Sequence, residues 1–155
     1  HPTAIDLRLE IKADAERFRY PGLEQRIADM LVNHNMHQRT TVTSFTIDTL
    51  LSFQEWLPDV PLIWLIDRSI VRQLGELDAI LAIAARRGVS EVALHQSDLA
   101  SEQIEIAHAR SLKVGGYAVN DEASIRRMFD LNATAFTTNR PDLAIKIRAD
   151  IMAAG

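Results

Sequence analysis

The chain has 155 residues, of which 47% are hydrophobic and 25% are charged. This balance is typical of a compact globular protein, so we expect residues 1–155 to form a single domain. The formal charge of −4 and the lack of a basic run argue against a nucleic-acid partner. The sequence has no cysteine, which excludes disulfides and thiolate metal sites. No apolar run approaches the roughly 18 residues of a membrane span, so we expect none.

Strand-like segments alternate with helical patterns along the whole chain. Six segments have the composition of buried strands, at residues 7–12, 41–45, 62–66, 91–95, 114–119 and 133–137. A helical pattern follows each one, and the longest predicted helix runs from about residue 70 to residue 87, before Gly88. Because each helix must carry the chain back across the sheet, the pattern predicts six strand–helix units with parallel strands.

Two α/β architectures fit this alternation, an open doubly wound sheet and a closed barrel of eight units. A dinucleotide-binding open sheet fits poorly, because Gly115-Gly116 lies at the start of a strand and not in a strand-to-helix turn. Polar residues stand at or just after the ends of successive strands, and a barrel brings all such ends to one mouth. These residues are Glu10, Lys12, Ser44, Asp67, His95, Asn120, Thr138 and Asn139. We therefore predict an α/β barrel fold.

The first strand places a carboxylate and an ammonium group two residues apart. Side chains alternate along a strand, so Glu10 and Lys12 share one face. A carboxylate suits a hard cation such as Mg²⁺ or Ca²⁺, and a lysine neutralises an anion. The segment predicts a site that holds a metal and a phosphate together. The alternative is a half-exposed strand whose outer face is charged.

Four segments resemble the glycerophosphodiester phosphodiesterase family. They are Leu9-Glu10-Ile11-Lys12, Ser44-Phe45 with Thr46-Ile47-Asp48, Tyr117-Ala118-Val119-Asn120-Asp121, and Thr137-Thr138-Asn139-Arg140-Pro141. They fall in the family's order with similar spacing over nearly the whole chain. The resemblance implies a TIM (β/α)8 barrel and a metal-dependent hydrolysis of glycerophosphodiesters to an alcohol and sn-glycerol 3-phosphate. The cofactor it implies is Mg²⁺ or Ca²⁺, and the partner is this small-molecule substrate.

The resemblance assigns two charged residues to the site. It makes Glu10 a metal ligand and Lys12 the residue that faces the substrate phosphate. Ser44, Phe45 and Tyr117 match positions that shape the glycerol and phosphate pocket. For the two aromatic residues the alternative is core packing.

Two further residues are candidates for substrate binding. Asn120 either bonds polar groups of the pocket or caps the following helix, and its residue type favours the cap. His95 is the one histidine that we expect at the rim of the barrel mouth, where it lines the pocket. No carboxylate partner for it is evident from the sequence, so we assign it no role as acid or base.

The catalytic segments of the family have no match in residues 1–155. These are a His-Arg-Gly segment, a Glu-x-Asp pair and a second histidine, all of which precede the Glu-x-Lys strand in the family. We therefore place no catalytic residue in this chain and expect it to carry the last six units of an incomplete barrel. Thr138-Asn139 also stands where the family has Thr-Asp. The chain begins with His1 and not Met, so we expect an upstream segment.

Two functions remain from different classes. The first is a glycerophosphodiester phosphodiesterase of which this chain is a part, with a cytoplasmic location expected and a periplasmic or secreted one as alternatives. The second is a non-catalytic barrel fragment that acts as a binding or assembly module. In either case unpaired strand edges predict a homo-oligomer or pairing with the missing N-terminal segment.

Overall fold

The computed structural model describes residues 6–16 and 18–154, which form a five-stranded parallel sheet with the strand order β1-β2-β3-β4-β5. The strands are β1 (Leu7–Glu10), β2 (Thr40–Ser44), β3 (Leu62–Ile66), β4 (Glu91–His95) and β5 (Lys113–Tyr117). The helices are α1 (Leu23–Asn33), α2 (Ile47–Gln54), α3 (Arg68–Leu74), α4 (Leu77–Arg86), α5 (Ser101–His108), α6 (Glu122–Asp130) and α7 (Pro141–Ala154), with 3₁₀ turns η1 (His37–Arg39) and η2 (Gln96–Asp98).

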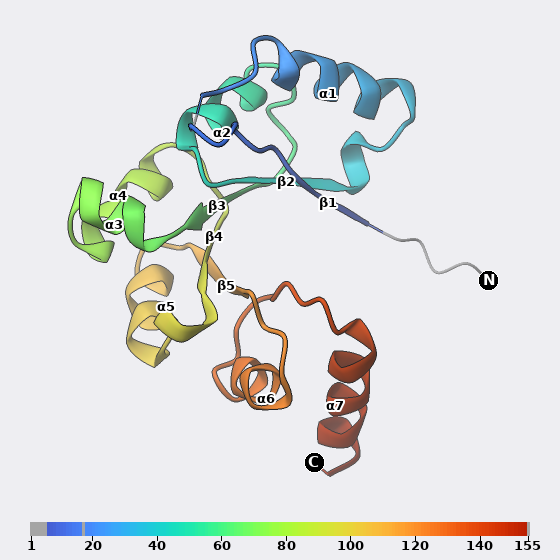
Figure 1. Ribbon diagram of the computed structural model, residues 1–155, viewed down its shortest axis with the longest axis vertical. Helices are drawn as coiled ribbons and strands as arrows, with labels where there is room; N and C mark the ends of the chain where they lie inside the picture. Colours follow the sequence, from blue (N-terminus) through green and yellow to red (C-terminus); the bar gives the residue numbers. More distant parts are fainter. Residues whose placement is uncertain (1–5, 17, 155) are drawn as a thin grey trace.

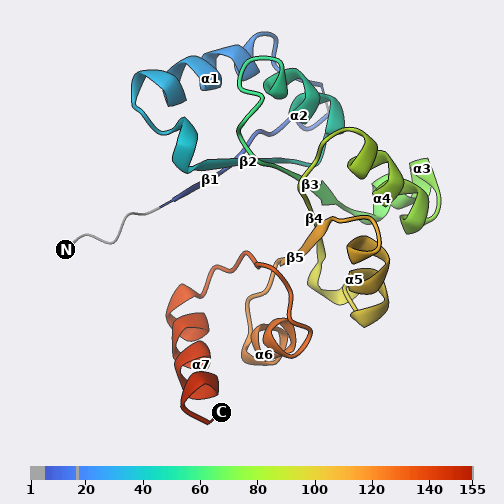
Figure 2. The same ribbon diagram turned by 180° about the vertical axis from the view of Figure 1, so that it is seen from behind.

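The sheet curves, and the helices lie around its outer side (Figures 1 and 2). Neighbouring strands in the sheet are also neighbours in the sequence, as in a wall of a (β/α) barrel. No helix in the described part of the chain is both long and apolar enough to cross a bilayer.

The two faces of the sheet are packed differently. On the outer face, side chains such as Leu62, Trp64 and Val92 join the main hydrophobic core with the helices. On the inner face a smaller cluster forms from Ile63, Leu65 and Ala93, with Phe45 and Tyr117 packed against it. All five residues of β3 are buried, because this central strand is covered on both faces.

The sixth predicted strand is present only as an irregular segment. Residues 133–137 run beside β5, and Gly116 N–H donates to Ala135 O at 3.0 Å while Thr137 N–H donates to Gly116 O at 2.9 Å. The pairing amounts to a single parallel bridge between Gly116 and Phe136. The prediction of six regular strands is therefore wrong in its last member, although the segment occupies the position of a sixth strand.

The long helix predicted from residue 70 to residue 87 is two helices. Gly75 has φ of 95° and ends α3, and α4 begins at Leu77. An apolar pattern continues through the break, which is why periodicity alone does not reveal it. Gly88 follows α4 with φ of 74°, so the predicted end of the segment is confirmed.

An ion pair crosses the inner face at the amino ends of the strands. Arg8 Nη2 on β1 lies 3.2 Å from Glu91 Oε1 on β4. Glu91 is only 8% exposed, and a Cβ on Gly115 would lie 2.9 Å from the same carboxylate oxygen. Burial raises the pKa of Glu91, and the positive charges of Arg8 and Lys113 oppose this only in part.

We predict that Glu91 makes stability depend on pH. Because its folded pKa lies above the unfolded one, its contribution is fully present below the unfolded pKa and is lost as pH rises through the folded pKa. Relative to Glu91→Gln, the wild type should therefore lose unfolding free energy as the pH rises above the ordinary pKa of a glutamate, about 4, and through the raised folded pKa. Urea unfolding of both proteins across this pH range measures the difference between their free energies of unfolding. Groups that titrate in the same way in both proteins cancel in this difference. A difference that is constant or grows with pH would contradict the prediction.

Candidate active site

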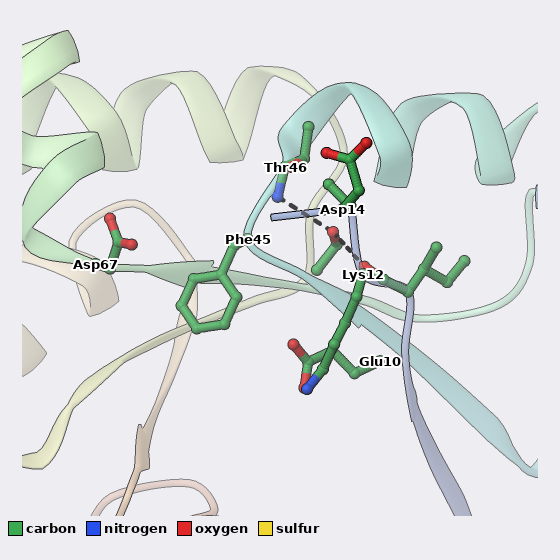
Figure 3. Close-up of a pocket in the computed structure, with 9 residues that line it drawn as sticks. Glu10, Lys12, Asp14, Phe45, Thr46 and Asp67 are labelled. Atoms are coloured by element: carbon green, nitrogen blue, oxygen red, sulfur yellow. Dashed lines mark hydrogen bonds and ion pairs between the residues drawn. The ribbon is translucent and has the colours of Figure 1, made fainter. Parts of the chain in front are cut away.

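A hollow of about 280 Å³ lies at the carboxyl ends of β1, β2 and β3. Figure 3 shows Glu10 and Lys12 extending side by side, with the ring of Phe45 beside them and Asp67 further along the sheet. The lining residues are Glu10, Ile11, Lys12, Ala13, Asp14, Ser44, Phe45, Thr46 and Asp67. The structure therefore brings four of the predicted site residues together, namely Glu10, Lys12, Ser44 and Phe45.

Glu10 and Lys12 form a loose ion pair. Lys12 Nζ lies 3.9 Å from Glu10 Oε2, and their side chains are 73% and 33% exposed. An exposed pair of this kind contributes about 0–1 kcal/mol, so little free energy holds the two groups together. Both side chains can therefore exchange this contact for a ligand.

Ser44 joins the ends of β1 and β2. Its hydroxyl donates to Ile11 O at 2.8 Å and accepts from the N–H of Thr46 at 3.1 Å (Figure 3). Ser44 is 1% exposed and Ile11 is 3% exposed. The hydroxyl thus both donates and accepts within the protein, and it joins Ile11, the residue before Lys12, to the turn after β2.

The loop after β1 is held by polar contacts that sequence reasoning did not find. The Asp14 carboxylate accepts from the N–H groups of Glu16 at 3.0 Å and Phe18 at 2.7 Å. Arg19 donates to Glu24 Oε1 through Nε at 3.0 Å and through Nη2 at 2.8 Å, and Glu24 is 5% exposed. Glu24 lies in the first turn of α1, so this pair ties the loop that carries Lys12 to a helix.

Three aromatic side chains, Phe45, Tyr117 and His95, form a row across the inner face at the carboxyl ends of the strands, which we call the mouth. The Tyr117 ring meets Phe45 at a centroid distance of 5.5 Å and 87°, and His95 at 5.5 Å and 79°. Tyr117 Oη donates to Ile66 O at 3.3 Å, and burial raises its pKa to about 12, so the phenol stays neutral. Phe45 and Tyr117 therefore serve in packing as well as lining the mouth, while His95 and Tyr117 line a second hollow beside the first.

Asn120 does not cap the following helix as its residue type suggests. Asp121 is the N-cap of α6, and its carboxylate accepts from Ser124 N–H at 2.8 Å. Asn120 Oδ1 instead accepts from Asn139 N–H at 2.8 Å. The capping interpretation is wrong, because Asn120 fastens the segment after residue 137 to the end of β5.

The hollow offers an incomplete set of metal ligands. Glu10 supplies a carboxylate of the type that Mg²⁺ or Ca²⁺ prefers. Among residues 6–16 and 18–154, however, no group of three or more metal-binding side chains converges. The described residues thus fit one ligand of such a site and not the whole of it.

We predict that Ser44→Ala loosens the strand ends that hold Lys12. The free energy of unfolding should fall by about 1–2 kcal/mol, because a buried hydroxyl loses two hydrogen bonds. Ser90→Ala is the matched control, since its hydroxyl donates to Leu62 O at 2.9 Å away from this hollow. Amide exchange at Thr46 should accelerate in Ser44→Ala and not in Ser90→Ala. Unchanged exchange at Thr46 in both variants would rule out the proposed tie.

Comparison with known proteins identifies the family. Residues 5–143 match the model of the Glycerophosphoryl diester phosphodiesterase family. A glycerophosphodiester phosphodiesterase of Bacillus subtilis strain 168 is 26% identical over 137 residues, which cover 83% of this chain and 45% of that protein.

Solved structures agree with this result. A crystal structure from Agrobacterium tumefaciens strain C58, assigned to the glycerophosphoryl diester phosphodiesterases, has a TM-score of 0.91 and 27% identity over 98% of this chain and 61% of its own. A phosphodiesterase of Oleispira antarctica in complex with sn-glycerol-3-phosphate shares the fold, with a TM-score of 0.65 and 17% identity over 91% of this chain and 54% of its own.

The chain spans 45% of the Bacillus protein and 61% of the Agrobacterium chain. The family match nevertheless covers most of its residues, and the observed strand order agrees with the predicted barrel fold. The resemblance seen in the sequence motifs is confirmed: this chain belongs to the glycerophosphoryl diester phosphodiesterase family.

Proposed function

We propose that the protein containing this chain hydrolyses glycerophosphodiesters to an alcohol and sn-glycerol 3-phosphate, with Mg²⁺ or Ca²⁺ as cofactor. The observation that carries the proposal is the placement of Glu10, the last residue of β1, and of Lys12, two residues later, in a hollow at the carboxyl ends of the strands. Both lie within the residues that match the family model. Active sites of (β/α) barrels lie at this end. The family match does not favour the alternative of a non-catalytic module.

Each charged residue has a distinct role in this proposal. Glu10 holds the metal, which when bound would polarise the phosphodiester. Lys12 neutralises charge that develops on the phosphoryl oxygens, and its exposed ammonium group is free to move toward them. Ser44 keeps the two strand ends in register through its bond to Ile11 O. We assign proton transfer to the family's histidines, which have no match in residues 1–155.

The unpaired edge of β1 indicates where further strands of a barrel could pair. In the part of the chain that the structure describes, β1 pairs with β2 on one edge and with no strand on the other. An unpaired edge exposes backbone donors and acceptors that can pair with another strand. We propose that this edge is covered by further strands of the same protein or by a second copy.

We predict that Glu10→Gln weakens metal binding in the full-length gene product. A carboxylate binds a hard cation more strongly than an amide does, so the Mg²⁺ or Ca²⁺ affinity should fall about tenfold or more. Isothermal titration with each metal measures this directly. Glu91→Gln removes a carboxylate from the opposite end of the same sheet face and should leave the affinity unchanged. Equal affinities for Glu10→Gln and wild type would exclude Glu10 as a ligand.

We predict that Lys12→Ala lowers kcat/KM for a glycerophosphodiester by about one to two orders of magnitude, because a charge-assisted contact to phosphate is lost. Lys12→Arg should recover little, since a guanidinium differs in shape and reach. The assay is release of glycerol 3-phosphate by the full-length gene product. Lys113→Ala, a lysine at the amino end of β5, is the control that should remain active. Turnover by Lys12→Ala equal to that of the wild type would remove Lys12 from the site.

A further inference from the structure

The ion pair with Glu10 does little to fix Lys12 in the hollow. The ammonium group lies 3.9 Å from Glu10 Oε2, and 73% of the lysine side chain is exposed. An ion pair that is this open to water and salt holds a side chain only weakly. The place of the ammonium group therefore depends on how firmly the backbone around residue 12 is held.

The backbone is fastened on the strand side of Lys12. Ile11 N–H donates to Thr43 O at 2.8 Å, and Ile11 O accepts from the Ser44 hydroxyl, also at 2.8 Å. Ile11 is only 3% exposed, so water competes little for these bonds. The residue before Lys12 thus has both of its backbone polar groups bonded to β2.

The backbone is fastened again two residues after Lys12. Asp14 N–H donates to Phe18 O at 2.9 Å, and the Asp14 carboxylate accepts from Phe18 N–H at 2.7 Å. Figure 3 shows this carboxylate directed away from the Lys12 ammonium group. The two reciprocal bonds join residues 14 and 18, so only Lys12 and Ala13 lie between the two fastened points.

The second fastening reaches the helical layer through Arg19, the residue after Phe18. Arg19 donates to Glu24 Oε1 through Nε at 3.0 Å and through Nη2 at 2.8 Å. Glu24 lies in the first turn of α1, whose residues Ala28 and Leu31 belong to the main core. Because Glu24 is only 5% exposed, its carboxylate depends on this partner in place of water. Loss of the pair would release the chain next to Phe18 and, through it, Asp14.

From these contacts we infer that Arg19 and Glu24 are positioning residues for the proposed hydrolysis, because they hold the loop in the form that directs Lys12 toward the substrate phosphate. The inference rests on the proposed function and adds two residues that do not line the hollow. A group that neutralises charge in a transition state is most effective when it is already held in place, since little reorganisation then accompanies the reaction.

The test is a double-mutant cycle in the full-length gene product, with kcat/KM for glycerophosphocholine as the measured quantity. Arg19→Gln should lower kcat/KM about fivefold, because Lys12 is no longer held in place. In a Lys12→Ala background the same substitution should change kcat/KM less than about twofold, since the side chain that Arg19 positions is gone. A purely structural role of Arg19 predicts the same loss in both backgrounds.

Two further variants separate loosening of the loop from general damage to the fold. Arg19→Gln leaves the buried Glu24 carboxylate without its guanidinium partner, so Arg19→Gln/Glu24→Gln, which removes both charges, should show the same coupling to Lys12. Arg110→Gln is the matched control, because Arg110 pairs at 2.6 Å with Asp78, a carboxylate in the first turn of α4. It should leave kcat/KM within about twofold of the wild type.

Amide exchange supplies a readout that does not depend on turnover. Exchange at Asp14, whose N–H is bonded to Phe18 O, should be several-fold faster in Arg19→Gln than in the wild type and unchanged in Arg110→Gln. Equal losses of kcat/KM in both backgrounds of the cycle, or unchanged exchange at Asp14, would overturn the positioning role and leave the hydrolase proposal standing. Failure of the wild type to hydrolyse any glycerophosphodiester would overturn the proposed function and this inference with it.

Discussion

The parallel register of β1 against β2 is the constraint on which the candidate site depends. Glu10 pairs with Thr43, and Ile11 N–H donates to Thr43 O at 2.8 Å just beyond the end of β1. A shift of one residue would turn Glu10 and Lys12 toward the face that the helices cover. Ser44 secures this register with its bond to Ile11 O, and burial of Ile11 opposes the same shift.

The two ends of the sheet carry charged pairs of different kinds. At the amino ends, Arg8 and Glu91 meet across the inner face in a pair that is largely buried. At the carboxyl ends, Glu10 and Lys12 are more exposed and only loosely paired. The largely buried pair of Arg8 and Glu91 is part of the interior, whereas the more exposed Glu10 and Lys12 remain available to a ligand. The aromatic row of Phe45, Tyr117 and His95 lies between the mouth and the interior cluster.

Sequence patterns predict the parts of this structure that depend on local periodicity and on strand ends. Five of the six predicted strands and the convergence of Glu10 with Lys12 follow from alternation and from parallel pairing. The break at Gly75 lies within a continuous apolar pattern, and residues 133–137 hydrogen-bond to the β5 region but form only one bridge, between Gly116 and Phe136. Gly75 is itself a signal of the break, because its φ of 95° favours glycine, whereas the composition of residues 133–137 does not reveal their irregular backbone.

Contacts between distant residues were beyond the reach of the sequence. The pairing of Arg68 with Asp98 joins residues 30 positions apart, and Asn120 meets Asn139 across 19 positions. The residue types suggested a cap for Asn120, because Asn is common at N-caps, but the neighbouring Asp121 takes that position. Arg19 and Glu24 are close in sequence, yet nothing in their spacing shows that the carboxylate is buried.

Binding of the expected product tests the central claim most directly. Titration of the isotope-labelled full-length gene product with sn-glycerol 3-phosphate, in the presence of Mg²⁺ or Ca²⁺, can be followed through its backbone amide signals. The account predicts shifts at Ile11, Lys12 and Thr46, next to the hollow at the carboxyl ends of the strands. Shifts confined to the amino ends, around Arg8 and Glu91, or none at saturating ligand, would contradict it.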